Sequence, residues 1–320
     1  MANQSFGFNT TSEEVTFSHS SQIANKTILI TGISPGGLGL QTALALAPHS
    51  PALLILAARS PTALAAAKTE IAAVAPDVPI KHLTLDLSSF RTVRAAATEL
   101  NGWSDVSGID ILVNNAGVMS TPWALSEDGV ESQFATNHLG PWLFTNLIME
   151  KIIQAKGRVV IVSSVGHMYG DVRFEDWNFE NGKLYDPDVA YGQSKTANAL
   201  NALSIVSKLG PKGVTAFSVH PGLVMTNITR AIPIETLQIK GFLDEEGKFT
   251  GIIPEKTISQ GAATALAAAL DPEIVDKNGA YLADCKVEHD NPVAEYAKSL
   301  ENAERLWQLS ERLTGEKFDF

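Results

Sequence analysis

A tyrosine and a lysine four residues apart, in the segment Tyr191-Gly192-Gln193-Ser194-Lys195, form the pattern with the clearest chemical potential in this sequence. On a helix, side chains at this spacing share one face, with Cβ atoms roughly 5–6 Å apart. A lysine ammonium so close favours the phenolate and lowers the tyrosine pKa from about 10 towards neutrality. A phenol tuned in this way can act as a general acid or base on an alcohol or a carbonyl. The same spacing also occurs on ordinary solvated helix faces, so the rest of the sequence must decide.

Strand-like and helix-like segments alternate along most of the sequence, from about residue 26 to residue 282. Short, apolar and partly β-branched runs predict strands buried on both faces, at residues 27–31, 53–57, 80–85, 109–114, 158–163, 214–219 and 280–283. Helices are predicted at residues 38–47, 62–75, 90–100, 128–153, 190–209 and 258–270, followed by a helical tail at 291–313. This alternation predicts an α/β fold, a Rossmann-type doubly wound parallel sheet of about seven strands in the order 3-2-1-4-5-6-7, with helices on both faces.

Composition and charge exclude several classes of protein. The 320-residue chain carries a net charge of −11, which argues against nucleic-acid and anionic-membrane partners. Cys285 is its only cysteine, so neither an intramolecular disulfide nor a thiolate zinc site can form, and the seven histidines lack metal-ligand spacing. No apolar run reaches the length of about 18 residues that spans a membrane. We therefore expect a cytoplasmic protein with no metal and no membrane anchor.

Two segments depart from the α/β alternation. Residues 1–22 are polar and lack the apolar stretch of a signal peptide, so we expect a flexible N-terminal arm before a single domain at residues 23–320. Residues 223–256 contain Pro233, Pro254 and three glycines among mixed charged and apolar residues. A long segment of this kind after a strand predicts a lid over a ligand.

A glycine-rich loop, Thr31-Gly32-Ile33-Ser34-Pro35-Gly36-Gly37-Leu38-Gly39, directly follows the first predicted strand and opens the first predicted helix. Glycines let backbone amides approach a pyrophosphate, and the N-terminus of a helix favours negative charge. A glycine string alone is also compatible with an ordinary tight turn. At a first strand-turn-helix junction, however, it predicts a dinucleotide site.

Residues after the second and third strands bear on the choice of dinucleotide. An acid after the second strand would bind a ribose 2′-hydroxyl and select NAD. Arg59 stands there instead and offers a charged fork for a 2′-phosphate, which favours NADP(H) over NAD(H), although a solvated arginine at a strand end is the alternative. Asp86-Leu87 ends the third strand, where the acid could meet an adenine amine or cap the next helix.

Taken in chain order, these motifs resemble those of the short-chain dehydrogenase/reductase family. The set comprises the Thr-Gly loop, Asn114-Asn115-Ala116-Gly117, Asn137, Ser163-Ser164, the Tyr191/Lys195 pair and His220-Pro221-Gly222. The resemblance covers residues 26–283. Within the family it is greatest to the retinol-dehydrogenase-like and WW-domain-oxidoreductase-like branch, especially its fungal reductases. That branch has a segment like Phe174-Glu175-Asp176-Trp177-Asn178-Phe179 between the serine and the tyrosine, which here lie 27 positions apart.

The resemblance implies a catalytic set of Asn137, Ser164, Tyr191 and Lys195. Ser164 would hold the substrate oxygen, Tyr191 would act as general acid or base, and Lys195 would lower the tyrosine pKa and bind the nicotinamide ribose. Asn137 would anchor a water in a proton relay with the lysine. Strand alternation allows only one of Ser163 and Ser164 to face the substrate. We choose Ser164 because it immediately precedes a stretch of small residues, as the family's serine does.

The resemblance also implies cofactor and substrate contacts. The cofactor would be contacted by Gly32, Ser34, Gly37, Leu38, Gly39, Arg59, Asp86, Leu87, Asn114, Ala116, Gly117, Tyr191, Lys195, Pro221, Gly222, Val224 and Thr226. A helix N-cap is an equal alternative for Thr226. Candidates to line an apolar substrate pocket are Met119, Trp123, His167, Met168, Tyr169 and the segment 223–239, each of which could equally belong to the core.

Two features depart from the family pattern. The glycine loop is one residue longer than usual, and Pro35 has no amide to donate to a phosphate. We expect the extra residue to bulge at the loop tip while Gly37-Leu38-Gly39 keeps the start of the helix. We expect no N-terminal membrane anchor like that of many retinoid enzymes, and this expectation argues against a retinoid substrate.

The predicted function is an NADP(H)-dependent oxidoreductase that interconverts a carbonyl and an alcohol on a fairly apolar small molecule, with fungal secondary metabolism as a setting. Two alternatives stay open: non-redox chemistry on the same fold, such as cyclisation or dehydration, and a cofactor-binding regulatory scaffold. A hydrolase is disfavoured because neither serine lies in G-x-S-x-G. The resemblance also implies a homodimer through the helices at residues 128–153 and 190–209, although the branch contains monomers as well.

Overall fold

A seven-stranded parallel sheet forms the centre of the protein, in the predicted order β3-β2-β1-β4-β5-β6-β7. The computed structural model describes residues 6–248, 250–252, 254–287, 289 and 292–320. The strands are β1 Thr27–Thr31, β2 Leu53–Ala58, β3 Ile80–Thr84, β4 Ile111–Asn114, β5 Arg158–Val162, β6 Thr215–His220 and β7 Tyr281–Ala283. Because β1 pairs with both β2 and β4, the direction of the crossovers reverses at β1, and ligands of open α/β sheets bind at such a point.

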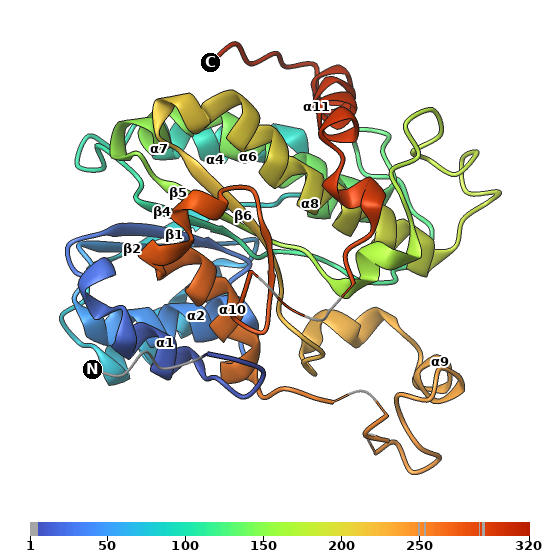
Figure 1. The fold of residues 1–320 in the computed structure, drawn as a ribbon, viewed down its shortest axis with the longest axis horizontal. Coiled ribbons are helices and arrows are strands. Elements are labelled where there is room, and N and C mark those ends of the chain that lie inside the picture. Colours follow the sequence, from blue (N-terminus) through green and yellow to red (C-terminus); the bar gives the residue numbers. More distant parts are fainter. Residues whose placement is uncertain (1–5, 249, 253, 288, 290–291) are drawn as a thin grey trace.

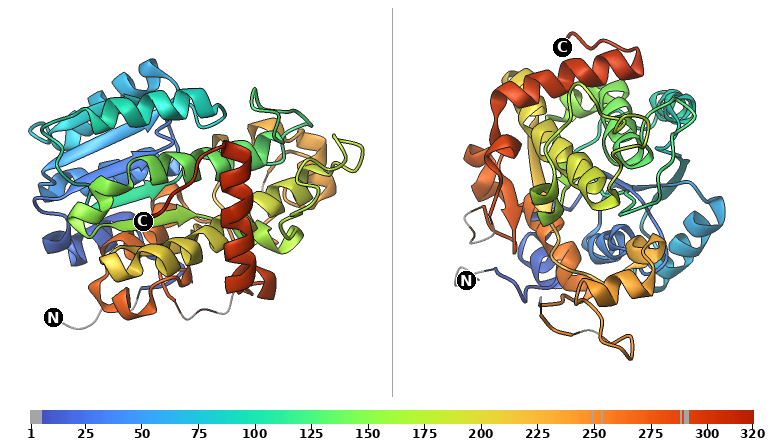
Figure 2. Two further views of the ribbon diagram at one scale, coloured as in Figure 1. Left: turned by 90° about the horizontal axis from the view of Figure 1, so that it is seen from above. Right: turned by 90° about the vertical axis from the view of Figure 1, so that its right-hand side faces the viewer.

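Helices cover both faces of the sheet (Figures 1 and 2). One face carries α1 Ser12–Ser18, α2 Leu38–Leu46, α3 Pro61–Val74 and α10 Ile258–Leu270. The opposite face carries α4 Phe90–Asn101, α6 Gly140–Leu147, α7 Met149–Ala155, α8 Pro187–Leu209 and α11 Leu300–Thr314. Within the described ranges, no helix combines the length and apolar character needed to cross a membrane.

Successive side chains of a strand point to opposite faces of the sheet, so the strands contribute to two separate hydrophobic cores. In β1, Leu29 packs with Phe134 and Trp142 in the core below α4, α6 and α8. Its neighbours Ile28 and Ile30 pack in the other core, against α2 and α10. Both faces of the central strands are therefore buried, which explains why the sequences of these strands are continuous apolar runs.

The helix predicted at residues 128–153 is found in part: it begins at Ser132, and four consecutive helical elements form it in place of one regular helix. They are α5 Ser132–Phe134, a π-helical turn at Ala135–Leu139, α6 and α7. Pro141 lacks the amide hydrogen that would bond to the carbonyl of Asn137 in a regular α-helix, so the α pattern is interrupted there. Gly140 lets this region approach the segment between β3 and α4, since a Cβ at Gly140 would lie 2.1 Å from the carbonyl oxygen of Leu87.

The described part of the N-terminal segment is ordered, contrary to the prediction of a flexible arm at residues 1–22. Thr11 and Glu14 form a capping box at the start of α1. Val15 and Thr16 are buried, and the Ser12 hydroxyl lies 2.9 Å from that of Ser259 on α10. The polar composition of this segment suggested a loose arm, but its polar side chains bond to the core instead. Residues 1–5 lie outside the described residues.

The C-terminal helix α11 packs across α8 and α6, the elements predicted to form a homodimer interface (Figure 2). The Ser204 hydroxyl of α8 donates to the carbonyl of Ala303, and Trp142 of α6 meets Trp307 edge to face at 5.1 Å between ring centroids. The Lys208 ammonium lies 4.9 Å from the Trp307 ring. A dimer formed by pairing α6 and α8 would require α11 to move aside. The predicted tail helix at 291–313 corresponds to α11 and the short turn Glu295–Lys298, and residue 291 lies outside the described residues.

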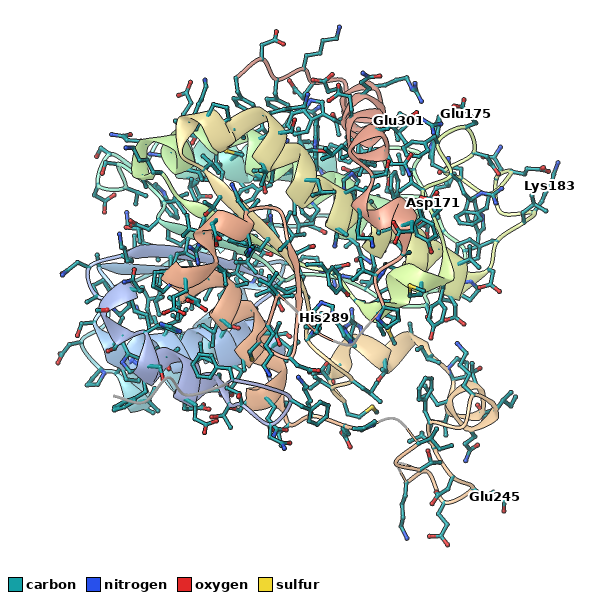
Figure 3. All side chains as sticks on the ribbon, viewed as in Figure 1. Asp171, Glu175, Lys183, Glu245, His289 and Glu301 are labelled. Carbon is teal, nitrogen blue, oxygen red and sulfur yellow. The ribbon has the colours of Figure 1, made fainter. Side chains whose placement is uncertain are left out.

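The segment at 223–256 projects beyond the sheet and carries η6 Asn227–Ala231 and α9 Ile234–Ile239. A bridge between Leu223 and Glu255 brings its two ends together. Figure 3 shows Glu245 at the outer tip of this segment, far from the sheet. Its role as a lid stays a prediction, and residues 223–256 are called the lid below only as a name for this segment; residues 249 and 253 lie outside the described residues.

Candidate active site

A cavity of about 880 Å³ opens at the carboxyl ends of the central strands, beside the point where the crossovers reverse. Its walls come from the glycine loop, from the residues that follow β2 to β6, from α8 and from the lid segment. Of the residues predicted for catalysis and ligand binding, the cavity brings together Gly32, Ser34, Gly37, Leu38, Arg59, Asp86, Leu87, Ala116, Gly117, Met119, Ser164, Tyr169, Tyr191, Lys195, Pro221, Gly222, Val224 and Thr226.

The glycine loop turns tightly from β1 into α2. Gly32 has a φ of +78° and lies so close to the next strand that an added Cβ would be 2.6 Å from the Cα of Ala116. The amide of Gly37 donates to the carbonyl of Ser34 at 3.0 Å, which closes the extra-residue turn. Gly37 is the N-cap of α2, so the helix starts at Leu38, as expected. The loop therefore presents a helix N-terminus to the cavity, where an anion is favoured.

Two charged residues line the adjoining part of the cavity. Arg59 is exposed and, among the described residues, has no hydrogen bond or ion pair. Asp86 accepts hydrogen bonds from the amide and the hydroxyl of Ser88, at 3.0 and 2.7 Å. The following helix α4 is capped by Ser89, so Asp86 closes a turn and does not cap the helix.

The structure separates the roles of the two adjacent serines. Ser163 is buried, and its hydroxyl donates to the carbonyl of Lys195 at 2.7 Å, which ties β5 to α8. Ser164 is half-buried, and its hydroxyl oxygen accepts from the amide of Gly166 at 3.0 Å while lying against the phenol of Tyr191. The choice of Ser164 as the serine beside the tyrosine agrees with this geometry.

Burial dominates the protonation of both Tyr191 and Lys195, which corrects the expectation that the lysine lowers the tyrosine pKa. Burial raises the pKa of Tyr191 to about 12, while the Ser164 hydroxyl acts in the opposite direction. Burial also lowers the pKa of Lys195 to about 8. The reason is geometric: Lys195 Nζ donates to the carbonyl of Val162 at 3.0 Å and lies 5.5 Å from the centroid of the tyrosine ring. The phenol is therefore a proton donor at neutral pH.

Asn137 lies behind the cavity wall, in the π-helical turn. Its Oδ1 accepts from the amide of Val118 at 2.8 Å, and its Nδ2 donates to the carbonyl of Val118 and to the Ser194 hydroxyl, both at 2.9 Å. A Cβ added at Gly117 would lie 3.1 Å from Asn137 Oδ1 and 3.5 Å from Lys195 Nζ, so the two side chains meet at Gly117. The asparagine thus joins the strand-to-loop segment after β4 to the helix that carries Tyr191.

Several predicted contacts do not reach the cavity. His167 is fully buried: Nδ1 lies 2.7 Å from the carbonyl oxygen of Ser164, and Nε2 accepts from the amide of Ala294 at 3.2 Å. Its assignment to a substrate pocket is therefore wrong, because both ring nitrogens connect buried backbone. Asn114 points away from the cavity and donates to Thr145 at 2.9 Å. Gly39, Trp123 and Met168 are likewise absent from the cavity walls.

Three polar contacts in the cavity walls were missed in the sequence. Asn115 faces the cavity instead of Asn114 and donates to the carbonyl of Thr31 at 2.9 Å, and strand alternation could have shown this. Asp188, near the start of α8, accepts from the Ser120 hydroxyl at 2.7 Å. Asp188 also forms an ion pair with Lys240 of the lid, which no local sequence pattern indicates.

Comparisons with known proteins indicate the family of this chain. A family model described as short chain dehydrogenase matches residues 26–236. The chain is 37% identical over 317 residues to a chloroplastic short-chain dehydrogenase TIC 32 A of Brassica napus, covering 96% of this chain and 94% of the relative. It is 37% identical over 295 residues to retinol dehydrogenase 12 of Mus musculus, covering 92% of this chain and 88% of the relative.

A solved structure also resembles this one along nearly its whole length. It is that of an uncharacterised protein of Mycobacterium paratuberculosis, with a TM-score of 0.69 and 32% identity, covering 93% of this chain and 96% of that chain. The family model alone spans most of the chain and includes the glycine loop, Ser164, Tyr191 and Lys195. By sequence, fold and arrangement of the cavity, the protein belongs to the short-chain dehydrogenase family.

Proposed function

We propose that the protein is an NADP(H)-dependent oxidoreductase that interconverts a carbonyl and an alcohol on a fairly apolar small molecule in the cytoplasm. One observation carries the proposal: Ser164, Tyr191 and Lys195 line the same cavity as a helix N-terminus preceded by a glycine loop. A cavity with both parts can hold a phosphate-bearing cofactor and a reacting oxygen together. The setting in fungal secondary metabolism stays a prediction. The homodimer expected from the sequence is not part of the proposal, because α11 covers the face of α6 and α8 that it would use.

The residues present fit a nicotinamide dinucleotide. The amides at the start of α2 suit a pyrophosphate, and Thr226 adds a hydroxyl at the far wall, although it also caps η6 by accepting from Ile228. Arg59 provides a guanidinium without a partner among the described residues, which suits a 2′-phosphate. When bound, such a cofactor supplies or accepts the hydride.

The side chains around Tyr191 supply the proton and orient the substrate. In carbonyl reduction, the neutral phenol of Tyr191 donates a proton to the substrate oxygen, and the Ser164 hydroxyl holds that oxygen by a hydrogen bond. Lys195 remains charged at pH 7, because its pKa of about 8 is still above neutrality. Its ammonium, held by the Val162 carbonyl, lies 5.5 Å from the centroid of the Tyr191 ring. At that distance its charge offsets only part of the cost of the negative charge that develops on the buried phenol oxygen.

The substrate end of the cavity favours an apolar molecule with one reacting oxygen. Its walls include Val118, Met119, Tyr169, Val189, Ile232, Leu237, Phe242 and Leu243. At this end Asp188 of α8 and Lys240 of the lid form an ion pair, so their two charges neutralise each other. Such a lining recognises a ligand mainly by the apolar surface that it buries.

Replacing Arg59 with alanine should weaken NADPH binding about tenfold or more and leave NADH binding nearly unchanged, since a charge-assisted hydrogen bond contributes about 1.5–3 kcal/mol. Titration of both cofactors by fluorescence measures this selectivity. Arg91→Ala is a matched control, because Arg91 is an exposed arginine outside the cavity. Equal binding of NADPH and NADH by the wild type would contradict the preference for NADP(H), and binding of neither would contradict an oxidoreductase.

The rate of carbonyl reduction should decline as pH rises above about 8, because Lys195 then loses the charge that stabilises the phenolate. Lys195→Arg keeps its charge to higher pH and should move this decline upward, at a lower maximal rate because the guanidinium is larger. The measurement is a pH profile of kcat for both proteins. Profiles that decline at the same pH would assign the titration to a different group.

A further inference from the structure

Lys256 is a lysine with a fully buried side chain outside the catalytic set. Its side chain is 0% exposed, and its ammonium pairs with Asp284 Oδ1 at 2.6 Å. Burying a charged pair costs free energy that its mutual attraction barely recovers, and a well-packed apolar side chain would often be more stable. Stability alone is therefore a weak explanation for a lysine at this position, and what it contacts becomes the relevant question.

The stem of Lys256 lies directly against a glycine of the cavity wall. Gly222 has a φ of +87°, and a Cβ added there would lie 2.7 Å from Cδ of Lys256 and 2.9 Å from its Cε. The backbone amide of Lys256 donates to the carbonyl of Leu223 at 2.8 Å. Gly222 and Leu223 both line the cavity. Lys256 therefore contacts, through backbone and stem, the turn at which the chain leaves β6 for the lid.

The ammonium of Lys256 also reaches the N-terminal segment. It lies 4.7 Å from the centroid of the Phe8 ring, within the range of a cation–π interaction. Two further contacts hold this segment against the start of α10: Gln260 Nε2 donates to the carbonyl of Asn9, and the hydroxyls of Ser12 and Ser259 bond to each other. Residues 6–18 thus close one side of the space around Lys256.

His220 completes the arrangement from the strand. Its Nδ1 accepts from the amide of Gly222 at 3.4 Å and from that of Val165 at 3.3 Å, so one ring nitrogen contacts the turn after β6 and the turn after Ser164. An accepting nitrogen must be unprotonated. Burial, and secondly the charge of Lys256, lower the pKa of His220 to about 4 and keep it in that form.

We propose that Lys256, held between Phe8 and Asp284, is a positioning residue that fixes Gly222 and the base of the lid at the cofactor end of the cavity. Lys256 touches no reacting atom and does not itself line the cavity, and it acts through its contacts with the backbone of Gly222 and Leu223. Its effect on cofactor affinity rests on the proposed function. Its effect on the lid base is a property of the protein itself and can be measured without any ligand.

Hydrogen exchange of the ligand-free protein and NADPH titration, on the same variants, test this role. Lys256→Met keeps most of the stem and removes the charge. It should speed exchange in peptides covering residues 221–226 and 254–257 by about tenfold, with remote peptides in β2 unchanged. It should also raise the Kd for NADPH about tenfold, and Lys256→Arg, which retains a cation, should recover most of both effects. Lys298→Met is the control, because Lys298 is a half-exposed lysine paired with Glu295.

Wild-type exchange at residues 221–226 in a folded Lys256→Met protein would overturn the proposal, as would a lower Tm with local exchange and Kd unchanged. If Lys256→Met fails to fold, the Phe8→Leu variant tests the positioning role of Lys256 instead. It leaves the Lys256–Asp284 pair intact and should speed the same local exchange by about threefold, and no change in that variant would overturn the proposal. A wild-type protein that binds neither NADPH nor NADH contradicts the proposed function, while the exchange data still decide the role of Lys256.

Discussion

Replacing Tyr191 with phenylalanine should lower turnover by about 10³-fold while leaving the Kd for the cofactor within about twofold of wild type. The variant keeps the ring that packs on Gly166 and loses only the hydroxyl, whose proton transfer is worth about 10²–10⁴-fold. Substrate orientation by Ser164 is lost in part as well, because the two hydroxyls lie against each other. Steady-state kinetics with a carbonyl substrate, together with a cofactor titration, separate the two effects.

Tyr169→Phe is the matched control for this result. Tyr169 also lines the cavity, but its side chain is 59% exposed. Its phenol should contribute little to proton transfer, and kcat should stay within about threefold of wild type. A Tyr191→Phe protein with full activity, or a Tyr169→Phe protein as inactive as Tyr191→Phe, would contradict the assignment of the acid to Tyr191.

Trp307→Ala should destabilise the protein by about 3–5 kcal/mol, the usual cost of emptying a buried tryptophan site. Trp307 is 2% exposed and packs on Trp142, and the Phe318 ring also meets Trp142, at 5.4 Å between centroids. Urea unfolding of Trp307→Ala and wild type gives this difference in the free energy of unfolding.

We expect the wild type to be a monomer in light scattering, because α11 occupies the face that a dimer of α6 and α8 would use.

The control for the stability effect is Phe17→Ala. Phe17 lies on α1 and is 77% exposed, so its loss should change the free energy of unfolding by less than about 0.5 kcal/mol. A Trp307→Ala protein as stable as wild type would mean that α11 contributes little to the fold. A dimer in the wild type would show that self-association uses a surface other than the covered faces of α6 and α8.

The sheet and the grouping of Ser164, Tyr191 and Lys195 in one cavity were predictable from the sequence, while the catalytic roles of these residues stay a prediction. β1 begins and ends at the predicted residues, and α10 matches its predicted range, since buried parallel strands and alanine-rich helices have compact apolar patterns. Tyr191, Lys195 and Ser164 could be named from their spacing and order. Ser164 and the Tyr191/Lys195 pair lie apart in the sequence. The parallel topology brings them together, because it places the carboxyl ends of all the strands at one edge of the sheet.

The errors have long-range causes. No local pattern shows that Ser12 would bond to Ser259, so residues 6–18 looked like a loose arm. His167 was a candidate for the substrate pocket, with a position in the core as the equal alternative, and its ring bonds to the amide of Ala294, which is distant in the sequence. The tyrosine pKa was predicted from helix spacing alone, which gives the distance between Cβ atoms but not the direction of the ammonium towards the Val162 carbonyl.

The joined ends of the lid segment have a consequence for how enzymes of this design diverge. Leu223 and Glu255 pair at the base, so the chain between them forms a loop whose two ends are held together. Doubling the length of such a loop raises the free energy of loop closure by only about 0.6 kcal/mol. Insertions, deletions and changed side chains there would alter the pocket without disturbing the sheet or the proton donor. New substrate ranges can therefore arise by mutation of one surface segment, while the chemistry is inherited unchanged.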